Sequence, residues 1–412
     1  MQQIHHYDIA IIGAGAVGMA CAIALAQRQY RVLLLDQQSR PNRQDMIDGL
    51  SVRDARVYAM NLPSIELLTQ IGVWQKVVRK ADYTQMQVWA KDGKGELLFA
   101  EDDLLPKTLG SMIEPSVLNM ALWERAVEPE VAQYLTLAYE AKLAAQGIDV
   151  GKEVSFSYHA LGETHRVACR LLIGADGRQS QVRQMMGIQV NRLDYHQKAI
   201  CCAIKTTRPH QHTARQIMLP TGTLAMLPMA DLTQADKACW HSIVWTLPTV
   251  MADEYLALSE VQLMQQLAIA MNDELGGISQ IESIASFALS AQMAQAYTAN
   301  QTVLIGDAAH GVHPLAGQGL NLGFFDVLAL LDELDKVAKR GVPLHQQALN
   351  AYQRVCMAHH GVMMHSFSMI NFAFTAQFAQ SGLVPWVRSE MMDWLSKQKS
   401  IVRFLNHKAN AR

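Results

Sequence analysis

Near its start, the chain alternates apolar runs with glycines in a pattern that predicts a strand, a tight turn, a helix and a second strand. Tyr7 to Ile12 is mostly apolar, with Asp8 near its beginning, and Met19 to Gln29 is alanine-rich and helical in pattern. Arg31 to Asp36 contains Val-Leu-Leu-Leu and closes on an acidic residue. These elements predict a complete βαβ unit.

Two later apolar runs also end in small and acidic residues. They are Leu171 to Gly177 and Val303 to Ala309. Both patterns are typical of buried parallel strands. In doubly wound sheets ligands lie beyond the carboxyl ends of the strands, so we expect these runs and the first strand to converge on one crevice.

The remaining pattern divides the chain further. Residues 194–290 contain alternating strand-like pieces, such as Ala199 to Ile204, Leu224 to Met229 and Ser242 to Leu247. From Leu344 onward the chain is helical in pattern and rich in Met and Phe. The predicted fold class is α/β, with a Rossmann-like nucleotide-binding domain, an inserted and mainly antiparallel β domain, and a helical C-terminus. The expected ranges are 1–75, 106–190 and 285–345 for the first, 76–105 and 191–284 for the second, and 346–412 for the third.

Composition narrows the functional classes. Half of the 412 residues are apolar and the formal net charge is -2, which gives no general argument for nucleic-acid binding. The cysteines contain no C-x-x-C pair, so neither a disulfide framework nor a zinc site is indicated. Residues 9–26 carry no charge, but three glycines interrupt them and Asp8 precedes them, so we expect a cytoplasmic protein.

The first turn carries Gly13, Gly15 and Gly18 in G-x-G-x-x-G spacing, between the predicted strand and helix. Glycine permits the sharp turn, the approach of a pyrophosphate and the packing of helix on strand, while the helix N-terminus offers N–H groups to phosphate. Asp36 is placed to accept hydrogen bonds from ribose hydroxyls, which disfavours a 2′-phosphate. FAD or NAD therefore fits this turn, and NADP does not; an ordinary turn with a solvated aspartate is the plain alternative.

Gly306 to Asn321 is the most informative stretch. Asp307 ends a strand and could bind a ribityl or pyrophosphate-side hydroxyl, and the turn from Gly317 to Asn321 could aim N–H groups at an electron-rich ring carbonyl. His310 and His313 have H-x-x-H spacing, but no third ligand has matching context, so we predict no metal.

Three motifs in this order resemble those of the single-component FAD-dependent aromatic hydroxylases. They are the first glycine turn, Gly174-Ala175-Asp176-Gly177-Arg178-x-Ser180-x-x-Arg183, and Gly306 to Asp326. Within that group the chain is most similar to the ubiquinone-biosynthesis hydroxylases of the UbiH/UbiF/UbiI type, the 2-polyprenylphenol monooxygenases. Segments around Arg56, Ile71 to Trp74, Leu118 to Trp123 and Pro220 to Pro228 carry this similarity, which covers nearly the whole chain. Gln87 to Asp92, Ala214 to Gln216 and Ser242 to Trp245 favour the member that acts at ring carbon 5.

The resemblance implies a Rossmann-like FAD-binding domain of the aromatic-hydroxylase type. It further implies that NAD(P)H reduces FAD, that O2 gives a flavin C4a-hydroperoxide, and that this hydroxylates the ring of a polyprenylated phenol. Arg56 is expected at the pyrophosphate, Asp176 and Asp307 around pyrophosphate and ribityl, and Pro314 to Asn321 against the isoalloxazine. The full set of expected FAD-binding residues is Gly13, Gly15, Gly18, Asp36, Arg56, Glu114, Asp176, Asp307, Pro314, Gly317, Gly319, Leu320 and Asn321.

Some assignments stay open. No proton-transfer residue is identified, and His313, Pro314, Gly317 and Gln318 are only candidates by their place in the flavin-facing loop. Glu114 stands where related hydroxylases often have Gln or Arg. Arg178 and Arg183 could serve NAD(P)H phosphates or cover the domain joint, and we favour the structural role.

The C-terminal tail offers apolar residues at helical spacing with basic residues among and after them. The apolar residues are Trp394, Leu395, Ile401, Val402 and Leu405, and the basic ones are Lys397, Lys399, Arg403, Lys408 and Arg412. This tail could rest on an anionic membrane or be an ordinary terminal helix. Other proteins of ubiquinone biosynthesis are expected as further partners. Two alternatives remain: hydroxylation of a small soluble phenol, and a non-catalytic flavin-binding scaffold within such an assembly.

Overall fold

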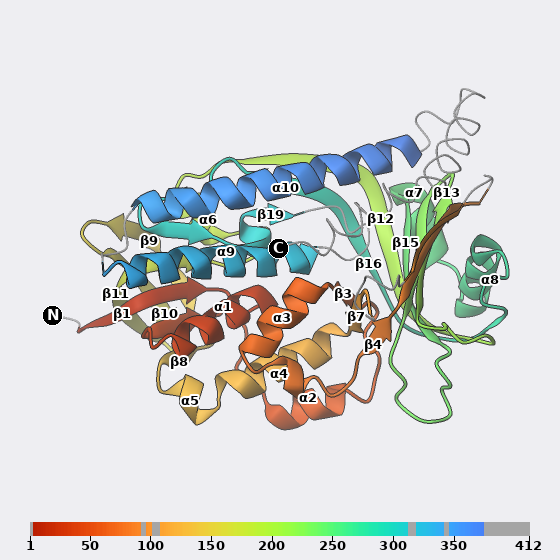
Figure 1. The fold of residues 1–412 in the computed structure, drawn as a ribbon, viewed down its shortest axis with the longest axis horizontal. Coiled ribbons are helices and arrows are strands. Elements are labelled where there is room, and N and C mark those ends of the chain that lie inside the picture. The colour runs from red at the N-terminus through yellow and green to blue at the C-terminus, as the bar shows by residue number, and fades with distance from the viewer. Residues whose placement is uncertain (1–2, 92–95, 101–107, 312–318, 342–345, 375–412) are drawn as a thin grey trace.

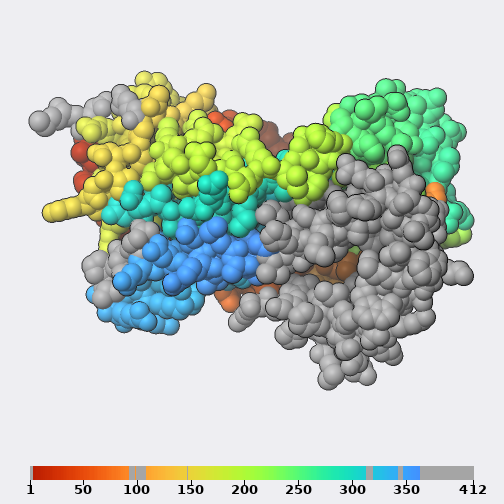
Figure 2. Space-filling view, turned by 90° about the horizontal axis from the view of Figure 1, so that it is seen from above, coloured from red at the N-terminus to blue at the C-terminus, as the bar shows by residue number. Residues whose placement is uncertain are grey.

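The computed structural model describes residues 3–91, 96–100, 108–311, 319–341 and 346–374. Its elements form two halves that lie end to end in Figure 1, one built on a mostly parallel sheet and the other on an antiparallel sheet. The long helix α10 (Gln346–Phe374) runs along the first half and reaches toward the second (Figure 1), and Figure 2 shows its first part lying on the outside of the first half.

The parallel sheet brings together the three expected strands. Its parallel members are β1 (Ile4–Ile12), β2 (Val32–Leu35), β8 (Leu135–Ala138), β11 (Glu163–Gly174) and β18 (Thr302–Leu304). β11 lies between β1 and β18, with Gly174 opposite Ile12 on one side and Leu304 on the other. The carboxyl ends of the three strands therefore meet at one edge, which confirms the expected convergence.

Antiparallel strands extend this sheet at its margins. They are β9 (Lys142–Val150), β10 (Val154–Ala160) and the short β17 (Thr298–Ala299). Helix α1 (Ala16–Gln27) packs between the sheet and its neighbouring helices, and its residues from Gly18 to Ala26 are all buried. A helix made of alanine, cysteine and aliphatic residues on every side is suited to such an enclosed position.

The second half is a sheet in the order β19-β16-β12-β15-β14-β13-β5-β6. All neighbours are antiparallel except β13 and β5. The strands are β5 (Gln85–Ala90), β6 (Glu96–Ala100), β12 (Val190–Thr206), β13 (Thr213–Leu219), β14 (Gly222–Pro228), β15 (Trp240–Pro248), β16 (Ile278–Ala294) and β19 (His310–Gly311).

Side chains alternate between the two faces of this sheet. On β12, Ile200, Cys202 and Ile204 belong to a core that the helices α7 (Thr249–Leu256) and α8 (Glu260–Met271) cover. Ala199 and Cys201, at the alternate positions of the strand, lie in a separate cluster on the opposite face. The alternation follows from strand geometry, and it leaves small residues on the face turned away from α7 and α8.

Smaller elements join the two halves. β3 (Tyr58–Met60), β4 (Ala81–Tyr83) and β7 (Gly110–Ile113) form a three-stranded sheet. The remaining helices are α2 (Arg43–Gly49), α3 (Leu62–Gln70), α4 (Pro115–Ala126), α5 (Pro129–Ala132), α6 (Gln181–Met185) and α9 (Gly319–Lys339), with the 3-10 turns η1 (Trp74–Lys76) and η2 (Gly306–Ala308).

The first two elements begin earlier than predicted, whereas the second strand, β2, covers only Val32–Leu35 of the predicted Arg31 to Asp36. The first strand begins at Ile4 and the first helix at Ala16, because the helix starts directly after the Gly15 turn. β16 runs unbroken across the predicted domain boundary between residues 284 and 285, and the division into domains stays a prediction. Among the described helices, none combines the length and apolar character that a bilayer-crossing helix needs.

Candidate functional site

A cavity of about 720 Å³ lies between the two halves, at the carboxyl ends of β1, β11 and β18. On the side of the parallel sheet it is lined by Gly15, Ala16, Val17, Gly18, Ala175, Gly177, Arg178, Ile305, Gly306 and Asp307. On the side of the antiparallel sheet it is lined by Ala199, Cys201, Ala225, Leu227, Val244, Ser286, Phe287, Ala288 and Leu289. Arg56, Val57, Tyr58, Gly311, Gly319 and Leu320 complete the wall.

The glycine turn after β1 requires its glycines for different reasons. Gly13 has φ +107°, and a Cβ there would lie 2.3 Å from the carbonyl oxygen of Ala175. A Cβ on Gly18 would lie 2.0 Å from the carbonyl oxygen of Gly13. At Gly15, by contrast, a Cβ would meet no atom within 4 Å, so nothing in the described protein explains the glycine there. The space beside Gly15 belongs to the cavity.

Asp36 stands at the end of β2 and supports the same turn. Its Oδ2 accepts a hydrogen bond from the N–H of Ala14 at 2.5 Å, and its Oδ1 accepts one from Gln38 at 2.8 Å. The carboxylate is thus held beside the glycine turn, outside the lining of the cavity.

A second polar turn, η2, follows β18 and brings the exposed Asp307 side chain to the cavity. The N–H of Gly306 donates to Oδ2 of Asp326 at 2.8 Å, and Nε2 of His310 lies 2.6 Å from the same oxygen. Asp326 is fully buried in α9. A buried carboxylate must be paired, and here the pairing fixes the turn that presents Asp307.

Helix α10 completes this buried cluster. Nε2 of His360 lies 3.4 Å from Oδ1 of Asp326, and the Tyr297 hydroxyl lies 3.1 Å from Nδ1 of His360. Burial, with His310 next to it, holds the pKa of His360 well below its usual range. His310, Asp326 and His360 are of metal-ligating types and lie close together. The Tyr297 hydroxyl can donate to Nδ1 of a neutral His360, whereas Nε2 of His360 and Oδ1 of Asp326 make no hydrogen bond among the described residues.

The turn after β11 is held by its own side chains. Oδ2 of Asp176 accepts hydrogen bonds from Gln181 at 2.6 Å and Val182 at 3.1 Å, at the start of α6. The Arg183 guanidinium is buried and donates to the carbonyl oxygens of Ala308 at 2.7 Å and Arg178 at 2.8 Å. These contacts support the structural role that we favoured for Arg183.

Arg178 reaches the antiparallel sheet. Its Nη2 donates to the hydroxyl of Ser290 at 3.0 Å and to the carbonyl oxygen of the same residue. The side chain also lines the cavity, so it both covers the joint between the halves and adds positive charge to the wall.

Arg56 contributes an exposed guanidinium to the cavity wall. Its Cζ lies 4.8 Å from the ring centroid of Phe287 and 5.6 Å from that of Tyr58. The two aromatic faces orient the cation without consuming all of its donors. Burial raises the pKa of Tyr58 and keeps this phenol neutral.

The wall on the antiparallel sheet is apolar and built from small residues. Ala199 and Cys201 of β12 lie beside Ala225 and Leu227 of β14 and Val244 of β15 on this wall. Burial raises the pKa of the Cys201 thiol to about 11, so the thiol is neutral near pH 7. Sequence reasoning missed this wall; the signal that could have found it is the set of small side chains Ala199, Cys201 and Ala203, which alternate with Ile200 and Ile204 along one apolar run.

Comparison with known proteins identifies the family. The family model described as "FAD binding domain" matches residues 6–365. The chain is 30% identical to the 3-demethoxyubiquinol 3-hydroxylase of Escherichia coli, over 89% of this chain and 90% of that protein. It is 31% identical to the ubiquinone hydroxylase UbiL of Rhodospirillum rubrum, over 84% of this chain and 76% of that protein. The chain belongs to the FAD-dependent aromatic-ring hydroxylases, in the branch of ubiquinone biosynthesis.

Solved structures show the same fold. The p-nitrophenol 4-monooxygenase PnpA of Pseudomonas putida superimposes with a TM-score of 0.72 at 17% identity, covering 100% of both chains. PqsL of Pseudomonas aeruginosa, described as a probable FAD-dependent monooxygenase, superimposes with a TM-score of 0.73 at 20% identity over 92% of this chain and 99% of that one.

The cavity of this hydroxylase fits FAD. Gly15 leaves open space where a phosphate group needs close approach to the backbone. Helix α1 begins there with no side-chain cap among the described residues, so its N-terminal N–H groups face the cavity edge. In this family FAD is the cofactor and NAD(P)H the reductant.

The expected FAD-binding residues fall into three groups. Gly15, Gly18, Arg56, Asp307, Gly319 and Leu320 line the cavity. Gly13, Asp36, Glu114, Asp176 and Asn321 lie outside the lining and hold the backbone around it. Pro314 and Gly317 lie outside the described residues. His313 and Gln318, which with Pro314 and Gly317 were the candidates for a catalytic role, and the tail from Trp394 to Arg412 lie outside them as well.

Two of the supporting residues have buried roles. Asn321 donates from Nδ2 to the Ala59 carbonyl oxygen at 2.7 Å and accepts from the Ser64 hydroxyl at 2.9 Å, which joins α9 to β3 and α3. Glu114 is buried and accepts two hydrogen bonds from Arg79, at 2.7 and 2.9 Å. Sequence reasoning did not identify Arg79 as the partner of Glu114.

Proposed function

We propose that this protein hydroxylates the aromatic ring of a polyprenylated phenol in ubiquinone biosynthesis, using FAD, NAD(P)H and O2. One observation carries the proposal: a single cavity joins the glycine turn and Asp307 to an apolar wall on the antiparallel sheet. A cofactor bound at the first side would present its reactive ring to a substrate packed on the second. The relatives named above are a 3-demethoxyubiquinol 3-hydroxylase and a ubiquinone hydroxylase by name, which supports the substrate class.

We assign the polar side of the cavity to FAD. Backbone N–H groups at Gly15 would bind the pyrophosphate, and the Arg56 guanidinium would add fixed positive charge. Asp36 would accept hydrogen bonds from the adenosine ribose, and Asp307 from the ribityl chain. Bound there, FAD supplies the redox chemistry that amino-acid side chains cannot: it takes a hydride from NAD(P)H and activates O2.

The apolar side would bind and shield the substrate. Among the described cavity-lining residues, charge is confined to Arg56, Arg178 and Asp307, and none of these lies on the antiparallel sheet. A wall of alanine, leucine and valine excludes water and accepts a flat ring with an apolar substituent. Cys201 stays protonated and is no base, so the phenol would be oriented by packing rather than by a charged side chain.

A polyprenylated substrate is strongly apolar, so its delivery to the enzyme has to be explained as well. We propose that the chain of the substrate reaches the enzyme from a membrane, with the basic and apolar tail from Trp394 to Arg412 as the surface contact. Association with other enzymes of the same route is part of this proposal. Ring carbon 5 remains the predicted position, whereas the Escherichia coli relative is named a 3-hydroxylase.

Deletion of the gene tests the proposal. We expect the quinone pool to fall and a polyprenylated precursor lacking one ring hydroxyl to accumulate, as identified by mass spectrometry. The structure of that precursor also gives the ring position. Complementation with the wild-type gene should restore the pool. A normal quinone pool in a strain without a second such hydroxylase would contradict the proposal.

A further inference from the structure

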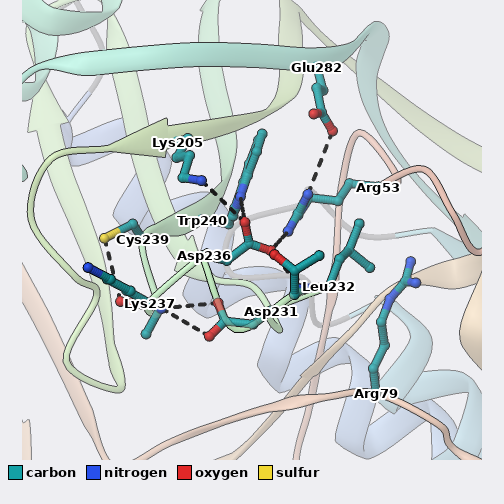
Figure 3. Close-up of polar contacts among 12 residues, drawn as sticks. Arg53, Arg79, Lys205, Asp231, Leu232, Asp236, Lys237, Cys239, Trp240 and Glu282 are labelled. Carbon is teal, nitrogen blue, oxygen red and sulfur yellow. Dashed lines mark hydrogen bonds and ion pairs between the residues drawn. The ribbon is translucent and has the colours of Figure 1, made fainter.

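Arg53 lies three residues before Arg56 and is bound by the antiparallel sheet. Only 4% of its surface is exposed. Its Nη2 donates to Oδ2 of Asp236 at 2.7 Å, and its guanidinium stacks on the Trp240 ring, 3.8 Å from the centroid. Figure 3 shows Arg53 reaching from its loop to Asp236 and Trp240, with Glu282 beyond it at 3.9 Å. The backbone is held as well, because the Ser283 hydroxyl donates to the Arg53 carbonyl oxygen at 2.5 Å.

Asp236 gathers donors from several segments onto one carboxylate. Its oxygens accept from the N–H groups of Leu232 at 2.9 Å and Thr233 at 3.1 Å, and from Nε1 of Trp240 at 3.1 Å. Nζ of Lys205 lies at 3.2 Å (Figure 3). A carboxylate with this many donors is a fixed anchor, and Arg53 is its link to the cofactor half.

Asp54, the residue after Arg53, binds to the start of α4 and not to the antiparallel sheet. The N–H of Asp54 donates to Oε1 of Glu114 at 2.9 Å, and Oδ2 of Asp54 accepts from the N–H of Ser116 at 2.7 Å. Arg79 holds Glu114 in turn, through two hydrogen bonds. Arg53 is thus tied to the antiparallel sheet while Asp54 is tied to the start of α4. Arg56 follows two residues later, at the cavity.

We propose that Arg53 is a positioning residue: it ties the segment that carries Arg56 to the antiparallel sheet and so sets the spacing between the FAD phosphate contact and the substrate wall. This inference rests on the proposed function, in which Arg56 contacts FAD. Neither Arg53 nor Asp236 lines the cavity, so the effect of either on FAD must pass through the loop.

A double-mutant cycle on FAD affinity tests the inference. Arg53→Lys loses the planar stacking on Trp240 and the fixed fork of donors, but it keeps a positive charge beside the buried Asp236 in addition to that of Lys205. We expect R53K to raise the FAD dissociation constant about fivefold in the wild-type background and less than about twofold in the R56A background. We also expect R53K to release more hydrogen peroxide per NAD(P)H consumed.

Controls separate positioning from loss of stability. Arg208→Lys is the matched control, since Arg208 follows β12 and pairs with Asp273 at an exposed site in the loops beside the antiparallel sheet. R208K should leave FAD affinity and peroxide release unchanged. If R53K lowers the melting temperature but leaves the FAD dissociation constant unchanged, or changes it equally in both backgrounds, Arg53 is structural only and the inference fails.

The R56A variant separates this inference from its premise. An R56A variant with unchanged FAD affinity would overturn the role of Arg56 in the proposed function, and with it the inference. If R56A weakens FAD binding but R53K changes the FAD dissociation constant by the same factor in both backgrounds, the role of Arg56 stands and only the role of Arg53 is overturned.

Discussion

The two sides of the cavity are built in different ways. The parallel-sheet side consists of turns, glycines and backbone N–H groups, with Asp307 presented by η2 and held through Asp326. The antiparallel side consists of side chains on regular strands, among them Ala199, Ala225 and Val244. Backbone groups suit the binding of a cofactor that is the same in every protein of a family. A wall made of side chains suits a substrate, because substitutions on regular strands change its shape without changing the fold.

The largest effect should come from the glycine turn. Gly13→Ala places a Cβ 2.3 Å from a backbone oxygen at φ +107°, so we expect it to abolish FAD binding and to lower the melting temperature by more than about 8 °C. Gly15→Ala meets no protein atom, so we expect a wild-type melting temperature for the apoprotein with at least about tenfold weaker FAD binding. Flavin absorbance measures FAD binding by each variant, and thermal unfolding measures its melting temperature. Equal behaviour of the two variants would refute the distinction.

Asp307→Ala should rank second. The side chain is exposed at the cavity, so its loss should weaken FAD binding about tenfold and leave the melting temperature of the apoprotein within about 2 °C. Asp332→Ala, an exposed acid on α9, is the control that removes the same charge away from the cavity. Unchanged flavin occupancy in purified Asp307→Ala would remove the role assigned to this residue.

A substitution on the antiparallel-sheet wall of the cavity should change substrate binding without changing FAD binding. Ala225→Leu fills part of the apolar wall, and we expect KM for the phenol to rise about tenfold while FAD affinity stays unchanged. Ala285→Leu on β16 serves as the control, because Ala285 does not line the cavity. If A225L instead releases FAD, the two sides of the cavity are not separate in function.

The smallest effect concerns pH and the antiparallel half. Burial, with His212 nearby, lowers the pKa of His210 to about 4. As the pH falls, His210 is therefore protonated in the unfolded chain at a higher pH than in the folded protein. The free energy of unfolding consequently decreases as the pH drops from about 6.5 toward 4. We expect a loss on the order of 1 kcal/mol between pH 7 and 5.5, measured by denaturant unfolding. His210→Asn should reduce this slope without abolishing it, because burial also lowers the pKa of His241 to about 3 and His241 contributes over the same pH range. An unchanged slope would contradict the assignment to His210.

The same contrast explains what the sequence could predict. The turns around Gly13 and Gly306 need particular residues at particular spacings, so the βαβ unit, the converging strands and the resemblance to FAD-dependent hydroxylases were all predictable. Ala199 and Ala225 carry no motif, and only the pairing of β12, β15 and β14 places them on one wall. Nothing in the sequence marks Arg53 as a positioning residue, because its partner Asp236 is 183 positions away.

The central claim is that FAD bound on one side of the cavity hydroxylates a prenylated ring packed on the other. The most direct measurement is incorporation of ¹⁸O from ¹⁸O2 by purified protein with FAD, NAD(P)H and a short-chain polyprenylphenol. We predict a product with one ¹⁸O atom in a new ring hydroxyl, detected by mass spectrometry. Oxidation of NAD(P)H that yields only hydrogen peroxide with this substrate, but a labelled product with a small soluble phenol, would contradict the account.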